Sequence, residues 1–267
     1  MVTNNDVAIH PTAFVAEGAQ LGKGVSVGAY SVIGASVVIG DNCKIFSHVV
    51  IDGHTTLGKG CEVFPFTTLG LAPQHLKYQG EPSRLTIGAS NIIREHVSMH
   101  VGTALDNMET IIGDHGLFMA GSHVAHDCVI GDHASFANGT GIAGHVKLGD
   151  HVYLGGYSAV HPFVRIGSHV IVGGGSIIVD DIIPYGAVVG ARAVLDGLNI
   201  IGLRRRGFTA SQIADLRAAY KILFEDQTGV FADRLASLQA SNQSDVVTTL
   251  ITFIDEKGKR PLCHPER

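Results

Sequence analysis

The feature of this sequence that most limits its possible folds is a series of apolar residues spaced six apart. The series begins at Ile9, keeps its register to Met99 with one interruption, and resumes, shifted by one residue, from Ile112 to Ile178. Gly follows half of these positions. A period of six fits neither a helix at about 3.6 nor a flat strand at 2. It predicts a chain that coils on itself, with a short strand and a Gly-assisted turn in each hexad and about 18 residues per three-sided coil.

Two segments interrupt this repeat, and a different pattern follows it. Residues 71–84 and 103–109 leave the predicted prism, and long loops on a rigid scaffold commonly carry function. After Asn199 the sequence changes, with a capping box at Thr209–Gln212 and apolar residues at helical spacing. We therefore expect a β-helical domain over residues 1–198 and an α-helical domain over 199–267. The positions that predict three helices are Ile213, Leu216, Tyr220 and Leu223; Phe231, Leu235 and Leu238; and Val247, Leu250, Ile251 and Ile254.

The composition narrows the function classes. Hydrophobic residues make up 45% of the 267 residues. Charged residues make up 16%, whereas they make up about a quarter of average globular proteins. This composition excludes a disordered chain. A net charge of −5 argues against nucleic acid and anionic lipid as partners. The sequence has no continuous apolar run of about 18 residues and no pattern of a signal peptide at its start. We expect no membrane insertion and a cytoplasmic location.

The cysteines suggest packing rather than chemistry. Cys43, Cys61 and Cys128 each lie two residues before a core position, in the slot that small residues occupy. Cys43 and Cys61 differ by 18, so they should stack on adjacent coils. We expect buried thiols that fill a core column, with no disulfide framework.

Four histidines gather at one predicted corner. An 18-residue coil brings His123, His126, His145 and His161 to one outer edge within two coil spacings, roughly 10 Å. Such a cluster could bind a metal ion or act as a general base in acyl transfer. A third possibility is a structural solenoid that only binds partners. It explains the repeat but gives no reason for the histidine corner or for the two excursions.

The zinc alternative has a specific difficulty. Zinc carbonic anhydrases built from hexapeptide repeats pair two histidines five residues apart, and no two histidines here have that spacing. We expect no metal. No Ser, Cys or Lys stands out as an acyl-enzyme nucleophile, so direct transfer is favoured over a covalent intermediate.

Three segments resemble the UDP-N-acetylglucosamine acyltransferases, a family of hexapeptide-repeat transferases. They are His123-Val-Ala-His126-Asp127-Cys128, the loop from Gln74 to Arg84, and the stretch from Asn199 to Phe208. The resemblance covers nearly the whole chain and implies an all-β left-handed parallel β-helix followed by a small helical domain, assembled as a homotrimer. The related N-acyltransferase of the same pathway has an extra domain before its repeats, which here begin at residue 7, so that sibling is disfavoured.

The resemblance also implies a reaction. A 3-hydroxyacyl chain would pass from acyl carrier protein to the 3-position of UDP-N-acetylglucosamine, as the first step of lipid A biosynthesis. No cofactor is implied, because the chain arrives on the phosphopantetheine arm of acyl carrier protein.

The same resemblance implies roles for individual residues. His126 would be the general base, Asp127 would orient it, and the backbone N–H of Gly144 would stabilise the thioester oxyanion. Because neighbouring residues on a strand point apart, a turn must bring His126 and Asp127 together. The substrate-binding residues would be Gln74, His75, Lys77, His123, His145, His161, Asn199 and Arg205, and Gly174 would set the acyl-chain length.

Three positions depart from the family pattern. His75 stands where the family usually has Asp, Ile201 where it usually has Glu, and Pro162 where Gln is common. Some members acylate a 3-amino sugar. Without a carboxylate at position 75 to pair with the ammonium form, the reactive neutral amine is easier to bind, which narrowly favours the 3-amino acceptor. A neutral His can also accept a hydroxyl proton, so the 3-hydroxyl acceptor stays open.

Overall fold

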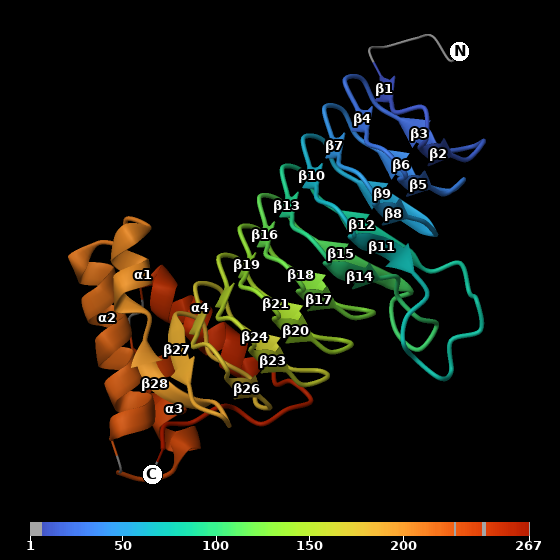
Figure 1. Cartoon of the computed structure of the whole chain (residues 1–267). Coiled ribbons are helices and arrows are strands. Elements are labelled where there is room, and N and C mark those ends of the chain that lie inside the picture. Colours follow the sequence, from blue (N-terminus) through green and yellow to red (C-terminus); the bar gives the residue numbers. More distant parts are fainter. Residues whose placement is uncertain (1–6, 227, 242–243, 267) are drawn as a thin grey trace.

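The computed structural model of the chain describes residues 7–226, 228–241 and 244–266. It is a three-sided prism of stacked coils with a group of helices at its C-terminal end (Figure 1). Each coil contributes one short strand to each of three sheets, and from β1 to β26 each strand pairs in parallel with the strand three places along the chain; at the end of the first sheet β25 pairs with β27. Cα partners such as Val124 and Ile142 are 18 residues apart, so the predicted coil length is confirmed.

The 28 strands of the described residues form three sheets, which contain 11, 9 and 8 strands. Sheet A contains β1 (Ala8–Ile9), β4 (Ser26–Val27), β7 (Lys44–Ile45), β10 (Glu62–Val63), β13 (Ile92–Ile93), β16 (Leu117–Phe118), β19 (Ser135–Phe136), β22 (Tyr153–Leu154), β25 (Ile171–Val172), β27 (Gly186–Val189) and β28 (Val194–Leu198). Sheet B contains β2 (Phe14–Val15), β5 (Val32–Ile33), β8 (Val50–Ile51), β11 (Thr68–Leu71), β14 (Ser98–His100), β17 (His123–Val124), β20 (Gly141–Ile142), β23 (Ala159–Val160) and β26 (Ile177–Ile178). Sheet C contains β3 (Gln20–Leu21), β6 (Val38–Ile39), β9 (His54–Leu57), β12 (Arg84–Ile87), β15 (Glu109–Ile112), β18 (Val129–Ile130), β21 (Lys147–Leu148) and β24 (Arg165–Ile166). The one antiparallel pair among the described strands, β27 with β28, ends sheet A.

The interior of the prism is the predicted apolar series. From Val27 onward every predicted core residue is buried, whereas Ile9 is 42% exposed and the next two are half-buried. The prediction is wrong for this first coil, whose strands β1, β2 and β3 each pair with another strand on one side only among the described residues. Cys43, Cys61 and Cys128 are buried free thiols, as expected.

The helical end has one more helix than the sequence pattern predicted. Its elements are α1 (Ile200–Arg205), α2 (Ala210–Tyr220), a π-helical turn η1 (Lys221–Glu225), α3 (Phe231–Gln239) and α4 (Asp245–Asp255). The predicted capping box is present, with Thr209 and Gln212 bonded reciprocally at the start of α2. The short helix α1, capped by the Asn199 side chain, was not predicted. None of the helices in the described ranges is long and apolar enough to span a bilayer.

Both predicted excursions leave the prism at the corner between sheets B and C, which we call the B–C corner. Their bounds are slightly narrower than expected, since Leu71, Arg84 and Glu109 belong to strands β11, β12 and β15. The loops therefore run over residues 72–83 and 101–108. One carboxylate joins them: Glu81 accepts a hydrogen bond from the Ala104 backbone N–H of the second loop, and a further one from the Gln79 N–H of its own loop.

Candidate active site

His126 and Asp127 form a tight pair in the turn that follows β17. His126 Nδ1 lies 2.8 Å from Asp127 Oδ2. Asp127 has a φ of 58°, a left-handed conformation that Asp tolerates better than most residues, and the turn allows adjacent side chains to meet. The expectation that a turn unites them is confirmed. Because the carboxylate accepts Nδ1–H, the neutral ring carries its lone pair on Nε2.

Asp127 is held in place by the second excursion loop. The Thr103 backbone N–H donates to Oδ1 at 2.9 Å and the Thr103 hydroxyl to Oδ2 at 2.6 Å. Asp127 is only 1% exposed. Burial alone would raise the pKa of this carboxyl, but the hydrogen bonds from His126 and Thr103 outweigh it and hold the pKa below its usual value. The group stays an anion beside the imidazole.

Gly144 lies one coil further on, directly against the ring of His126. A Cβ on Gly144 would lie 2.5 Å from Cε1 and 2.7 Å from Nε2 of His126. Among the described residues no backbone acceptor pairs with the Gly144 N–H, whereas its C=O accepts from Phe163. The site therefore has a free backbone donor next to the basic nitrogen of His126, the arrangement that an oxyanion hole requires.

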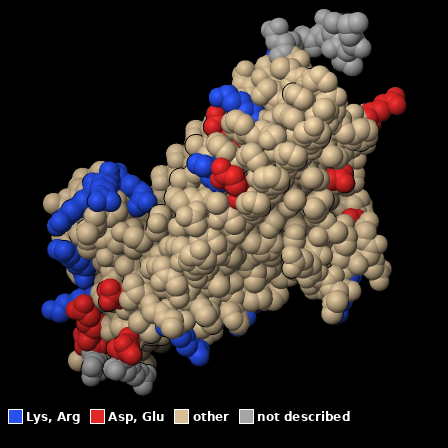
Figure 2. All heavy atoms as spheres, in the orientation of Figure 1, with Lys and Arg blue, Asp and Glu red and all other residues tan. Residues whose placement is uncertain are grey.

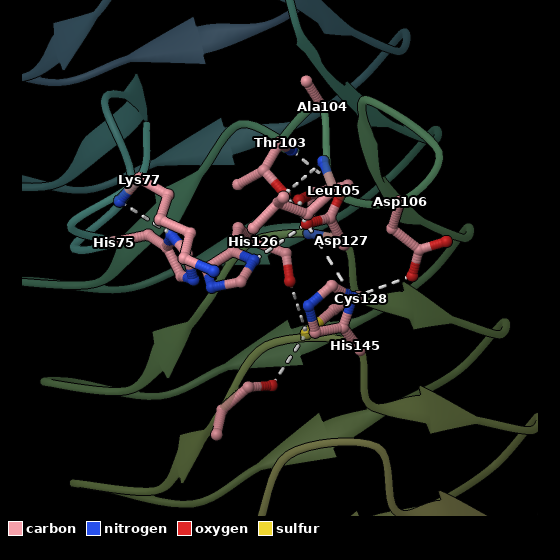
Figure 3. A network of polar contacts seen from close by, with 12 residues as sticks. His75, Lys77, Thr103, Ala104, Leu105, Asp106, His126, Asp127, Cys128 and His145 are labelled. Atoms are coloured by element: carbon pink, nitrogen blue, oxygen red, sulfur yellow. Dashed lines mark hydrogen bonds and ion pairs between the residues drawn. The ribbon is translucent and has the colours of Figure 1, made fainter. Parts of the chain in front are cut away.

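His145 forms a second histidine–carboxylate pair beside the first. Its Nδ1 lies 2.7 Å from Asp106 Oδ2 and 3.9 Å from Asp127 Oδ2. Its ring meets that of His126 edge to face at 5.0 Å and stacks on Phe163 at 4.4 Å. Figure 3 shows Asp106 on the far side of His145 from His126.

His123 lies in β17 next to a buried histidine, His100. Their rings are 4.9 Å apart, and His123 Nδ1 pairs with the Ser98 hydroxyl at 2.8 Å. Burial lowers the pKa of both, that of His100 to about 4, with a further contribution from neighbouring imidazoles. Both are neutral near pH 7. His100 Nδ1 is buried without a hydrogen-bond partner among the described residues, which is unusual for a buried ring nitrogen.

The first excursion loop brings His75 to the same corner. The rings of His75 and His126 meet edge to face at 5.0 Å, and the Lys77 backbone N–H donates to His75 Nδ1 at 3.2 Å. Lys77 and Gln74 are exposed beside it. His161 lies at the same corner two coils beyond Ala125, exposed to solvent, and its side chain makes no hydrogen bond, ion pair or ring contact within the described residues.

One group in the described part of the chain has the spacing of a metal site. Ligand atoms of His126, Asp127 and His145 lie within 4.8 Å of one another. Hydrogen bonds from the two rings to Asp127 and Asp106 account for this proximity. A metal ion would have to displace both bonded protons.

The remaining predicted residues lie on other sides of the prism. Gly174 is exposed at the corner between sheets A and B, two residues after β25. Asn199 caps α1, and its amide donates to the backbone C=O of His169 at 2.8 Å. Asn199 and Arg205 line a hollow of about 900 Å³ against sheet A, with Tyr153 and Ile171 in its wall. Sheet A faces away from the B–C corner, so one chain does not unite these residues with His126.

Sequence reasoning missed His100, Ser98, Thr103 and Asp106. Ser98 and His100 were hidden because the second excursion stretches the spacing to the next coil: Ser98 is paired with His123, 25 residues on. Aligning Met99 with Val124 across the loop would have revealed His100. Thr103 and Asp106 carry no periodic signal.

Three comparisons with known proteins agree with this arrangement. The profile of a family described as UDP-N-acetylglucosamine O-acyltransferase, domain 2, matches residues 181–263, and that of the bacterial transferase hexapeptide matches 109–144 and 145–180. The acyl-[acyl-carrier-protein]–UDP-N-acetylglucosamine O-acyltransferases of Azorhizobium caulinodans and Caulobacter vibrioides are 52% and 48% identical to this chain. Each alignment covers 98% of this chain, with 97% and 99% of the respective relative.

Solved structures give the same match. The UDP-N-acetylglucosamine acyltransferase of Campylobacter jejuni superimposes with a TM-score of 0.91 at 36% identity, covering 97% of this chain and all of that one. That of Francisella novicida gives 0.92 at 30% identity, covering 96% of this chain and 93% of that one. The similarity therefore extends over the prism and the helical end alike.

Proposed function

This chain belongs to the UDP-N-acetylglucosamine O-acyltransferase family, and we propose that it performs the family's reaction at the B–C corner with His126 as the general base. Its fold is the left-handed parallel β-helix with a small helical end. It is an acyl-[acyl-carrier-protein]–UDP-N-acetylglucosamine O-acyltransferase of lipid A biosynthesis. The finer statements, a 3-hydroxyacyl donor and the sugar 3-hydroxyl as acceptor, belong to the proposal.

The chemistry follows from the His126–Asp127–Gly144 arrangement. Nε2 of His126 takes the proton of the sugar hydroxyl as its oxygen attacks the thioester carbonyl. The developing oxyanion accepts a hydrogen bond from the Gly144 N–H, which pairs with no backbone acceptor among the described residues. Collapse of the intermediate breaks the C–S bond, and the imidazolium returns its proton to the leaving thiolate. Asp127 fixes the ring tautomer and stabilises the transient cation, as the carboxylate does in serine hydrolases.

The surrounding histidines form the proposed sugar subsite. His75, His100, His123 and His145 line the corner around His126, and His161 lies two coils beyond Ala125 at the same corner. His100 and His123 are neutral, so each offers one donor and one acceptor to hydroxyl and amide groups. The exposed side chains of Lys77 and Gln74 extend the same subsite.

The comparisons change one expectation. The amine interpretation of His75 is not favoured, because the relatives at about half identity are O-acyltransferases. A zinc-dependent hydratase is likewise not favoured. We propose direct transfer without a metal or other cofactor, with the acyl chain delivered on the phosphopantetheine arm of acyl carrier protein.

We further propose a homotrimer in which neighbouring chains complete each site. Asn199 and Arg205 would bind the nucleotide, with Arg suited to forked phosphate contacts, and Gly174 would limit the acyl chain. These residues lie away from the B–C corner of their own chain, so they serve one substrate molecule only if a neighbour supplies them. Figure 2 shows Lys and Arg gathered over the helical end near α1, where phosphate charge would be bound. Free thiols at all four cysteines fit a reducing compartment such as the cytoplasm.

The test of this proposal is His126→Ala. Loss of the general base should lower kcat by about 10²–10⁴-fold with acyl carrier protein and UDP-N-acetylglucosamine. The thermal midpoint should change little, because the ring lies outside the coil core. Near-normal turnover would refute the role of His126, and activity lost on chelation and restored by zinc would support the hydratase-like alternative instead.

A further inference from the structure

Two histidine–aspartate pairs lie side by side at the B–C corner, and one oxygen is within reach of both rings. Asp127 Oδ2 is 2.8 Å from Nδ1 of His126 and 3.9 Å from Nδ1 of His145. The same oxygen already accepts the Thr103 hydroxyl at 2.6 Å. A third donor would therefore compete directly with the bond that orients His126.

Asp106 removes this competition in the structure. Its Oδ2 accepts the His145 Nδ1–H at 2.7 Å, from the side of the ring opposite His126 (Figure 3). Phe163, stacked on His145 at an interplanar angle of 5°, keeps the ring in the plane that makes this bond possible. His145 therefore donates its Nδ1–H to Asp106, at 2.7 Å, rather than to Asp127, at 3.9 Å.

The loop that carries Asp106 is built to hold this position. Thr103 anchors it to Asp127, and the backbone N–H groups of Asp106 and Met108 both donate to the Thr103 C=O, at 3.3 and 3.2 Å. Glu81 of the other excursion accepts from Ala104. The loop thus supplies Asp106 as the acceptor for His145 and, through Thr103, holds Asp127 as the acceptor for His126.

We propose that Asp106 is a positioning residue of the acyl transfer, acting through His145. It reserves Asp127 for the general base and fixes His145 with Nδ1 protonated, so that Nε2 accepts a hydrogen bond from a hydroxyl or amide N–H of the acceptor sugar. The inference rests on the proposed role of His126 as general base.

Steady-state kinetics of Asp106→Ala test the first half of this inference. Without its acceptor, His145 shares Asp127 with His126, and misorientation of the base should lower kcat about tenfold. The KM for the sugar nucleotide should rise and that for acyl carrier protein should not. Asp106→Asn keeps an acceptor oxygen and should recover part of kcat. An unchanged kcat in Asp106→Ala would overturn the inference.

A double-mutant cycle separates action through His145 from a general effect on the loop. In a His145→Ala background, Asp106→Ala should have no further effect, because its only target is gone. Additive losses would contradict the inference. Asn107→Ala, an exposed neighbour on the same loop, is the matched control and should behave as wild type.

Proton NMR gives a readout independent of turnover. His126 and His145 of the wild-type protein should each show a low-field imidazole N–H resonance, and Asp106→Ala should shift both, because the two rings then compete for Asp127. Two resonances at unchanged positions in Asp106→Ala would overturn the inference. Measuring His126→Ala in the same assay distinguishes failure of this inference from failure of the proposed function. If His126→Ala remains active, the proposed function is wrong. If His126→Ala is inactive and Asp106→Ala has wild-type activity, only the role of Asp106 is wrong.

Discussion

Gly144 and His126 constrain each other across neighbouring coils. The ring of His126 covers the Cα of Gly144 so closely that any side chain at 144 would collide with it. The Gly144 N–H itself pairs with no backbone acceptor among the described residues. In the proposed mechanism one glycine therefore allows the close approach of the base and supplies the oxyanion contact.

Gly144→Ala should separate these effects from stability. The added methyl group must displace the His126 ring, so kcat should fall by about 100-fold, comparable to the loss of aligned catalytic geometry. The thermal midpoint should fall by only a few degrees, because the ring can move toward solvent. Full activity in purified Gly144→Ala, measured by product formation, would show that close contact between Gly144 and the His126 ring is not needed for transfer.

At the residue scale, what could be predicted depended on periodicity. His126, Asp127 and Gly144 were assigned from a resemblance that rests on consecutive residues, and the 18-residue coil then placed His145 beside them. Thr103 and Asp106 lie on a non-repeating loop, where no spacing rule fixes which side chain turns toward Asp127. Only the folded loop reveals them.

At the scale of elements, the corner between sheets C and A carries a column of aromatic rings. His115, His133, His151 and His169 stack one per coil, with ring centroids 4.5 to 5.0 Å apart, and Tyr185 ends the column. Its C-terminal end meets α1, where the His169 C=O accepts from Asn199 and the His151 C=O from Arg206. The column and α1 therefore form one packed unit. Helix α1 was not predicted because six residues are too few to show helical spacing and one of them is Gly202. Its N-cap residue, Asn199, is the one sequence feature that indicates a helix start there.

Lowering the pH should reduce the stability of this packed unit of aromatic column and α1. Burial, then neighbouring His151 and Arg206, lower the pKa of His169 to about 4, from 6.5 in an unfolded chain. A histidine with a lowered pKa binds fewer protons when folded, so its contribution is complete above pH 6.5 and is lost as the pH falls toward 4. His100 titrates over the same window.

Thermal unfolding measured at pH 7 and at about pH 4.5 tests this prediction, since the two values lie on either side of most of that titration. The midpoint of the wild type should fall over this interval, and that of His169→Phe, which keeps an aromatic ring but cannot bind a proton, should fall less. His133→Phe, the same change in the exposed part of the column, is the control. Identical pH dependence in wild type and His169→Phe would contradict the assignment.

At the scale of the whole molecule, the proposed active site would be divided between chains. The base and oxyanion donor lie at the B–C corner, whereas Asn199 and Arg205 line the hollow beside sheet A. The hexad pattern predicted the prism and placed the histidines at one corner, but not the surfaces that meet between chains. Strand outer faces repeat much alike along a solenoid, so periodicity does not mark which of them is covered.

Mixed trimers test the division most directly. His126→Ala and Arg205→Ala chains with different tags would each be nearly inactive alone, as homotrimers three times the 28.1 kDa chain mass. When both are co-expressed and the mixed species is purified, some sites combine an intact His126 from one chain with an intact Arg205 from another. We expect the mixed trimers to be well above either parent in activity. Mixed trimers no more active than the two parents, or a monomeric wild-type protein by light scattering, would contradict a site shared between chains.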